Sequence, residues 1–187
     1  VSKLWAGEDP KAILDAAVEV ARRSGPQGVQ VRALAKTVGV SPAAVYRHVP
    51  SIDALLAEVA QVARQELAVA LAERRDGVGK RRTRTATAQA RFAAAGRGYI
   101  DFALTEPRLF DTAFAPTTVC PDQPDDPSPW QVLVDGIDEL VAVGMVRARA
   151  ADRAALIAWA GVHGIASILV RQALTGPIDS DSAVDTV

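Results

Sequence analysis

Cysteine and histidine are scarce in this chain of 187 residues, which has one cysteine and two histidines. The lone cysteine, Cys120, has no second thiol with which to form an internal disulfide, so we expect a reducing compartment, the cytoplasm. The two histidines, His48 and His163, lie far apart in the sequence, and we expect no metal site. The first ten residues, VSKLWAGEDP, contain no apolar run of the kind found in a secretion signal, so we expect no secretion.

Patterns typical of enzymes are also missing. The sequence contains no glycine-rich phosphate-binding loop and no cofactor signature. Cys120 has no histidine nearby in sequence that could activate it as a nucleophile, and Asp125 and Asp126 lie in a proline-rich stretch typical of a solvated loop. We therefore expect no catalytic residue and no cofactor, and we keep an enzyme or a ligand carrier only as an alternative.

Long hydrophobic runs are limited to one uncharged stretch of 17 residues between Arg153 and Arg171. Its length lies at the lower edge of what can span a bilayer. It contains His163, Ser167 and several small residues, which lower its apolar content. A packed helix at a subunit interface is the better interpretation, and we expect no membrane contact.

Alternation of β-branched and polar residues is rare, whereas apolar residues recur with helical spacing, so we predict an all-α fold. Apolar residues make up 49% of the chain and charged residues 23%, which is typical of a folded globular protein. Capping residues, prolines and glycines mark the helix ends, with Asp9 as the cap of the first helix. The predicted helices cover residues 10–24, 31–38, 41–49, 51–75, 85–104, 107–114, 130–143 and 150–174.

The formal net charge of −1 hides an uneven distribution. Residues 1–60 carry seven basic and six acidic side chains, residues 61–110 carry ten and five, and residues 111–187 carry four and eleven. The first part of the chain could therefore face a polyanion, whereas the last part would repel one.

The segment around residues 31–49 has the spacing of two short helices that cross steeply. Ala35 is small where the backbones would approach, Gly39 can adopt a positive φ in the turn, and Val45 supplies a branched apolar contact. This is the helix-turn-helix pattern, whose second helix can lie in the major groove of DNA. We predict such a domain in residues 1–58 and a second, helical domain in residues 59–187.

The second helix of this motif carries the residues expected to contact DNA. Ser41 would cap it, so its first amides and the positive end of its dipole would face a phosphate. Arg47 could donate two hydrogen bonds to guanine, and small residues before it would let the backbone approach the bases. Tyr46 and His48 could reach phosphates, or they could instead close the small helical core.

With these residues in view, the stretch "VRALAKTVGVSPAAVYRHVPSIDALL" resembles the N-terminal signature of the tetracycline-repressor (TetR) family of transcriptional regulators. Later, "WAGVHG" at residues 159–164 is similar to the tryptophan, histidine, glycine motif of the family's WHG-type C-terminal domain, and "YIDFALTEPRLF" at residues 99–110 looks like an earlier segment of that domain. The resemblance implies an all-α fold with a helix-turn-helix. It also implies function as a homodimeric regulator, more often a repressor.

Carried over position by position, the resemblance places DNA contacts on both helices of the motif. The chain departs from the family at Gln30 and Val31, where threonines are common, and at Ile52, where a lysine is common. A phosphate contact at the last position would come from the Ser51 hydroxyl and nearby amides, or would be absent. The residues expected to bind DNA are Arg32, Ser41, Pro42, Ala43, Ala44, Tyr46, Arg47, His48 and Ser51.

Aromatic and sulfur-containing residues gather in the second half of the sequence and could line an apolar cavity for a small effector. Trp159 and His163 stand four apart on one helix face, where His163 could either pack or face a ligand. The residues expected to bind this ligand are Phe102, Phe110, Phe114, Trp130, Met145, Trp159 and His163. The basic stretch "KRRTR" at residues 80–84 is either a solvated connector or a second nucleic-acid patch.

The sequence thus predicts a cytoplasmic homodimer that binds a partly palindromic double-stranded DNA operator. Its dimer contacts are expected from the helices over residues 130–143 and 150–174. A small, mainly apolar effector would release the DNA by favouring a dimer that no longer fits it. The alternative within the same class is a constitutive DNA-binding regulator, which would have a filled core without a cavity.

Overall fold

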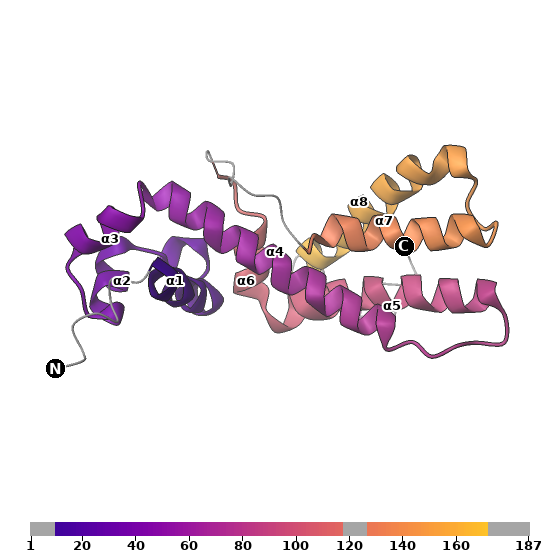
Figure 1. Ribbon diagram of the computed structural model, residues 1–187, viewed down its shortest axis with the longest axis horizontal. Helices are drawn as coiled ribbons and strands as arrows, with labels where there is room; N and C mark the ends of the chain where they lie inside the picture. The colour runs from indigo at the N-terminus through magenta and orange to yellow at the C-terminus, as the bar shows by residue number, and fades with distance from the viewer. Residues whose placement is uncertain (1–9, 118–126, 172–187) are drawn as a thin grey trace. The chain divides into compact units, whose positions relative to one another are not determined.

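The computed structural model describes residues 10–117 and 127–171, and in these ranges every regular element is a helix. The predicted all-α fold is therefore confirmed. The chain divides into two compact units (Figure 1). Of the described residues, the first unit contains 10–64 and 106–117, and the second contains 65–105 and 127–171.

The first unit is built from short helices around a small core. It holds α1 (Pro10–Ser24), the single turn η1 (Pro26–Gly28), α2 (Val31–Val38), α3 (Pro42–His48), the first half of α4 (Ile52–Asp76) and α6 (Pro107–Ala113). Ile13, Leu34, Val45, Leu55 and Val59 are fully buried there. Each such side chain contributes about 1.5–3 kcal/mol to folding, so these few residues fix how the helices pack.

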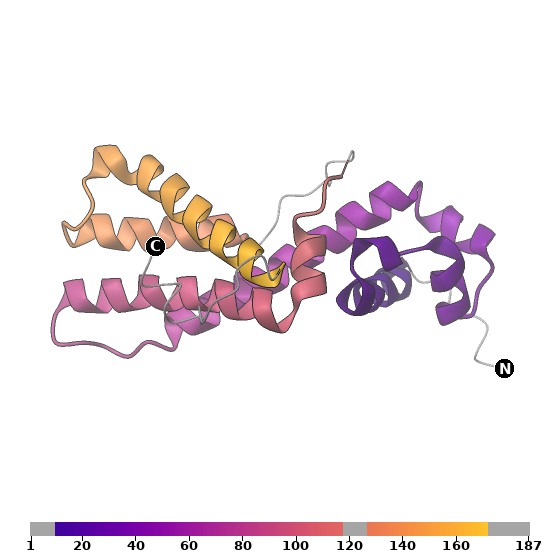
Figure 2. The ribbon, with the colours of Figure 1, turned by 180° about the vertical axis from the view of Figure 1, so that it is seen from behind.

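The second unit consists of longer helices. It holds the rest of α4, α5 (Arg84–Thr105), α7 (Pro129–Ala142), the turn η2 (Ala148–Ala150) and α8 (Ala151–Val170). α5 packs against both α7 and α8, which also contact each other, as the reverse view shows (Figure 2). Gly136 lets α5 and α7 approach closely, because a Cβ there would lie 2.9 Å from the Phe92 ring.

Most predicted helices lie where the spacing placed them. α1 has the predicted bounds, while its expected cap, Asp9, lies outside the described residues. α8 is described to Val170, so the expected continuation to Leu174 falls largely outside the description. The assignment of α6 to the first unit was not predicted: this helix packs on α1, and Arg22 forms an ion pair of 3.1 Å with Glu106.

Candidate nucleic-acid interface and ligand cavity

The turn between α2 and α3 has the geometry that the sequence predicts. Gly39 adopts φ 78°, a left-handed conformation that residues with a side chain rarely take. The Val40 N–H donates to the Ala35 carbonyl over 2.9 Å, which closes the end of α2. Leu34 and Val45 are fully buried beside this turn and lock the two helices together. The helix-turn-helix prediction is thus confirmed as local structure.

The start of α3 is capped and exposed. The Ala44 N–H donates to Ser41 Oγ over 3.1 Å, and Pro42 occupies the first helical turn. Val45 anchors the opposite face of α3 in the core. The exposed face therefore carries the helix start, where the positive end of the dipole can meet a phosphate.

Most residues predicted to contact DNA lie on the surface of the first unit. Ala44 does not, because it is 5% exposed and packs into the core, so its methyl group cannot reach a base. Tyr46 is 55% exposed, so its ring does not close the core as the alternative interpretation held. The exposed members of the predicted set are Arg32, Ser41, Pro42, Ala43, Tyr46, Arg47 and His48.

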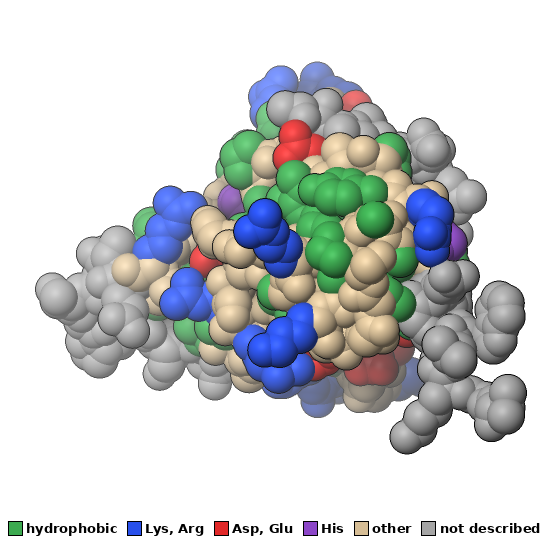
Figure 3. Space-filling model, turned by 90° about the vertical axis from the view of Figure 1, so that its left-hand side faces the viewer, with side chains coloured by type: hydrophobic (Ala, Val, Ile, Leu, Met, Phe, Trp, Pro, Cys, Tyr) green, Lys and Arg blue, Asp and Glu red, His purple; other side chains and the backbone are tan. Residues whose placement is uncertain are grey.

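The starts of the two neighbouring helices, α4 and α2, differ in whether a side chain caps them. Ser51 is half-buried, and its Oγ accepts a hydrogen bond of 3.0 Å from the Ala54 N–H at the start of α4. Gln30 precedes α2, and its side chain makes no capping hydrogen bond. From the end that carries α2 and α3, Lys and Arg side chains surround an apolar area and form no continuous basic stripe (Figure 3).

The residues predicted to line a ligand cavity do not gather in one place. Phe110 and Phe114 belong to the first unit, where their ring centroids lie 5.2 Å apart. Met145 is exposed in the turn after α7, and Phe102 is buried in α5. The remaining three form one aromatic cluster in the second unit, namely Trp130, Trp159 and His163.

An apolar cavity of about 140 Å³ does lie inside the second unit. Of the predicted ligand residues only Trp159 lines it. Its other walls come from α4, α5, α7 and α8. One face of α5 carries Phe92, Gly96 and Tyr99 at intervals of four and three residues, and this helical spacing could have been found from the sequence. The lining residues are Leu71, Phe92, Ala93, Ala95, Gly96, Tyr99, Pro129, Leu133, Ala158, Trp159 and Val162.

Tyr99 and His163 place one polar pair beside this apolar wall. The Tyr99 hydroxyl lies 2.8 Å from His163 Nδ1, and Trp159 stacks on the imidazole with an interplanar angle of 2°. Burial raises the pKa of Tyr99, so the phenol stays protonated and donates to Nδ1. Burial, helped by the charge of Arg171, lowers the pKa of His163, which favours the neutral ring that can accept this bond.

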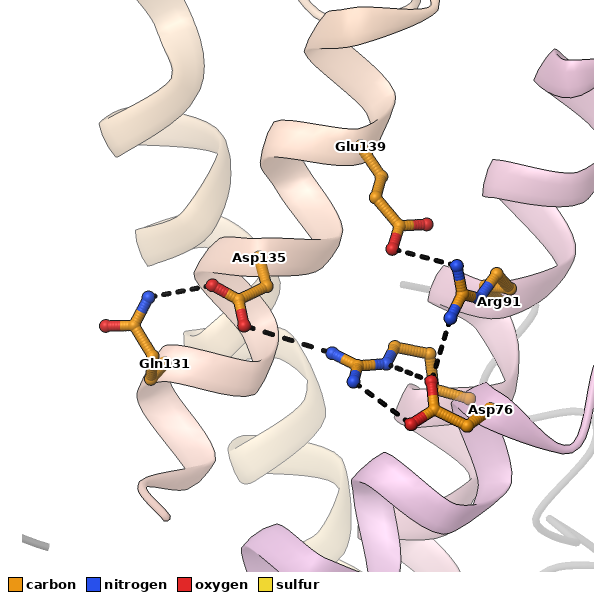
Figure 4. A network of polar contacts seen from close by, with 6 residues as sticks. Asp76, Arg91, Gln131, Asp135 and Glu139 are labelled. Carbon is orange, nitrogen blue, oxygen red and sulfur yellow. Dashed lines mark hydrogen bonds and ion pairs between the residues drawn. The ribbon is translucent and has the colours of Figure 1, made fainter. Parts of the chain in front are cut away.

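A network of charged groups ties the end of α4 to α5 and α7 (Figure 4). Arg91 donates to Asp76 over 2.8 Å and to Glu139 over 3.1 Å, while Arg75 Nε donates to Asp76 over 2.9 Å. The hydrogen bond from Arg75, followed by that from Arg91, lowers the pKa of Asp76. Because Phe92 follows Arg91 directly, the network lies one residue from the cavity wall.

Two further observations bear on other classes of protein. Among residues 10–117 and 127–171, no three His, Cys, Asp or Glu side chains gather in a way that could hold a metal ion. One helical stretch of the described chain, Ala148–Val170, is long and apolar enough to cross a membrane. That is weak evidence for a span, because packing helices of soluble proteins pass the same test.

Comparison with known proteins identifies relatives of both units. Residues 13–59 match the model for bacterial regulatory proteins of the tetR family, and residues 92–187 match the model for the tetracyclin repressor-like C-terminal domain. A curated relative from Bacillus subtilis, the uncharacterized HTH-type transcriptional regulator YobS, is 33% identical over 107 residues, which is 57% of this chain and 52% of the relative. The match thus spans about half of that relative's length.

Solved structures share the fold over nearly the whole chain. A protein of unknown function from Rhodococcus sp. RHA1 has a TM-score of 0.75 and 27% identity, covering 95% of this chain and 90% of that one. The TetR family transcriptional regulator PfmR from Thermus thermophilus has a TM-score of 0.57 and 17% identity, covering 93% of each chain. The capped helix-turn-helix and the two family matches lead to one conclusion: this chain belongs to the TetR family of bacterial transcriptional regulators.

Proposed function

We propose that the protein is a cytoplasmic repressor that binds a partly palindromic DNA operator as a homodimer and is released by a small, mainly apolar effector. The observation that carries the proposal is the exposed, Ser41-capped start of α3 with Arg47 on the following turn. A guanidinium at this place can form two hydrogen bonds with guanine, while the amides at the helix start bind a phosphate.

A second copy of the chain is expected on the exposed apolar face of α7 and α8. The adjacent side chains of Leu156 and Ile157 are 60% and 62% exposed, so this part of α8 presents apolar surface that a partner could cover. Gly164 adds a place for close approach, because a Cβ there would meet nothing within 4 Å. Trp130 of α7 is also exposed, so both helices contribute to a surface suited to a four-helix contact.

The cavity in the second unit favours a regulator that responds to an effector over a constitutive regulator, which would have a filled core. Its lining contains no charged side chain, so an unpaired charge on a ligand would stay without a partner there at a cost of several kcal/mol. An apolar cavity of this size suits a compact molecule such as one with a single aromatic ring. The Tyr99 and His163 pair offers one polar contact at its edge.

The ion-pair network suggests how the effector would act on α4. A ligand that displaces Phe92 would disturb Arg91 and with it the contacts that hold Asp76 and Glu139. Since α4 continues into the first unit, a shift of its end would change which dimer geometry is favoured.

DNA footprinting of the purified chain on the region flanking its own gene, with and without candidate effectors, tests the proposal. We expect two protected half-sites about one helical turn apart, and their protection should weaken when a compact neutral aromatic compound is added. Protection that is absent, or that covers a single half-site only, would contradict the proposal. Effectors that raise the melting temperature without changing operator affinity would remove the release step.

A further inference from the structure

A basic groove lies in the second unit, where the connector after α4 meets α5 and the end of α7. It has a volume of about 510 Å³. Four exposed cations line it, Lys80, Arg81, Arg82 and Arg84, and Arg91 joins them from the next turns of α5. Glu139 is the one carboxylate of the lining, so the groove carries an excess of positive charge.

Some arginines of the second unit have acidic partners among the described residues, but the cations of the connector have none. Arg74 pairs with Asp101, and Arg75 and Arg91 pair with Asp76. Within residues 10–117 and 127–171, none of the four exposed cations of the groove forms an ion pair. Positive charge at the surface therefore remains for a ligand.

The connector, residues 77–83, is held against the start of α5 by hydrogen bonds. The Arg81 N–H donates to Thr87 Oγ1 over 3.0 Å, so the chain folds back across the first turn of α5. Thr83 caps that helix, because its Oγ1 accepts from the Ala86 N–H over 3.0 Å. This arrangement fixes the backbone from which the arginines extend, which lowers the entropy cost of gathering them around an anion.

Ala88, Ala142 and Val143 form the apolar part of the groove's lining, which we call its floor. We propose that it binds a small organic polyanion, a molecule with two or more phosphate groups for the arginines and an apolar or aromatic part for this floor. Arginine forks match phosphate oxygens, and the volume lies in the range of pockets for small molecules. A duplex or a membrane would touch the rim without filling the floor.

Calorimetric titration of the full chain with adenosine triphosphate and with inorganic triphosphate tests this proposal. The variant pair is Arg81→Ser with Arg82→Ser, and the matched control is Arg147→Ser with Arg149→Ser, which removes two exposed arginines elsewhere in the same unit. We expect the groove variant to weaken the binding of both probes by about tenfold or more, as for lost hydrogen bonds to charged groups. The control should change it less than about twofold.

A second variant, Ala142→Trp, fills the apolar floor and leaves the charge unchanged. It should weaken the binding of adenosine triphosphate while inorganic triphosphate binds as before. The proposal is overturned if neither probe binds, if both arginine pairs weaken binding equally, or if Ala142→Trp has no effect on the nucleotide. It is also overturned if duplex DNA or vesicles of anionic phospholipid bind this groove more tightly than the nucleotide does.

Discussion

The hydroxyl of Tyr99 is a polar atom in the largely apolar interior of the second unit. Tyr99 is 1% exposed, and its hydroxyl bonds to His163 Nδ1 beside the stacked ring of Trp159. Removing the hydroxyl leaves the imidazole nitrogen in a half-buried place without this donor. The free energy lost when this hydrogen bond is removed measures how much the contact between Tyr99 and His163 stabilises the fold.

Tyr99→Phe should lower the free energy of unfolding by about 1–3 kcal/mol, because it removes the hydrogen bond between the buried Tyr99 and the half-buried imidazole of His163. Urea denaturation followed by circular dichroism measures this change. The matched control is Tyr46→Phe, where the side chain is 55% exposed and the expected change is within about 0.5 kcal/mol. Equal effects of the two substitutions would mean that the Tyr99 hydrogen bond contributes nothing.

Gly39 is the residue whose backbone conformation sets the turn of the helix-turn-helix. Gly39→Ala should destabilise the protein by about 1 kcal/mol, because φ 78° is strained for alanine although nothing lies within 4 Å of the added Cβ. Thermal unfolding measures the loss. Gly79→Ala, in the connector and with equally open space around it, serves as the control and should have little effect. A tolerated Gly39→Ala would show that the turn can adjust.

At the scale of elements, the sequence predicted what local chemistry determines. Helix bounds follow from Pro42, Ser41 and Gly39, and the structure has them as expected. The spacing along α5 indicates the face that carries Phe92 and Tyr99, but the sequence does not show which aromatic residues of different helices come together, because that depends on which helices pack together. Phe110 and Phe114 belong to the first unit because α6 packs on α1. Phe92 lines the cavity in the second unit, where its ring lies against Gly136, which has no side chain to exclude it.

The exposed face of α8 gives an element-scale prediction about assembly. Ile157→Asp should convert the proposed dimer to monomer, because a carboxylate at a close helix contact would be buried without a partner. Analytical ultracentrifugation measures the change. Ala148→Asp, an exposed position outside α8, is the control and should leave the dimer intact. If the Ile157 variant remains a dimer, the partner surface lies elsewhere.

For the whole molecule, the lowered pKa of His163 predicts that the free energy of unfolding depends on pH. Its pKa is lowered in the folded protein, so the unfolded chain takes up a proton first as the pH falls below about 6.5. Stability should therefore be full above that pH and decline below it, and His163→Gln should reduce the decline between about pH 6.5 and 5. Unfolding free energies measured across this range test the effect. An identical pH profile in wild type and variant would contradict it.

The charge distribution of the molecule sets a further expectation for DNA binding. Residues 1–60 carry only one more basic than acidic side chain. Few phosphate contacts imply that affinity falls less steeply with salt than for a strongly basic binder. Specific contacts from α3 must then supply much of the discrimination, and Arg47 is the side chain placed to make them.

The most direct test of this account is the operator affinity of Arg47→Ala, measured by gel shift at fixed salt beside the control Arg149→Ala. Loss of a two-pronged contact with guanine should weaken operator binding by about 1–3 kcal/mol per half-site and change binding to unrelated DNA far less. Arg149→Ala should bind the operator as the wild type does. Operator binding that is unchanged in Arg47→Ala, or weakened equally on any DNA, would contradict a base-reading role for α3.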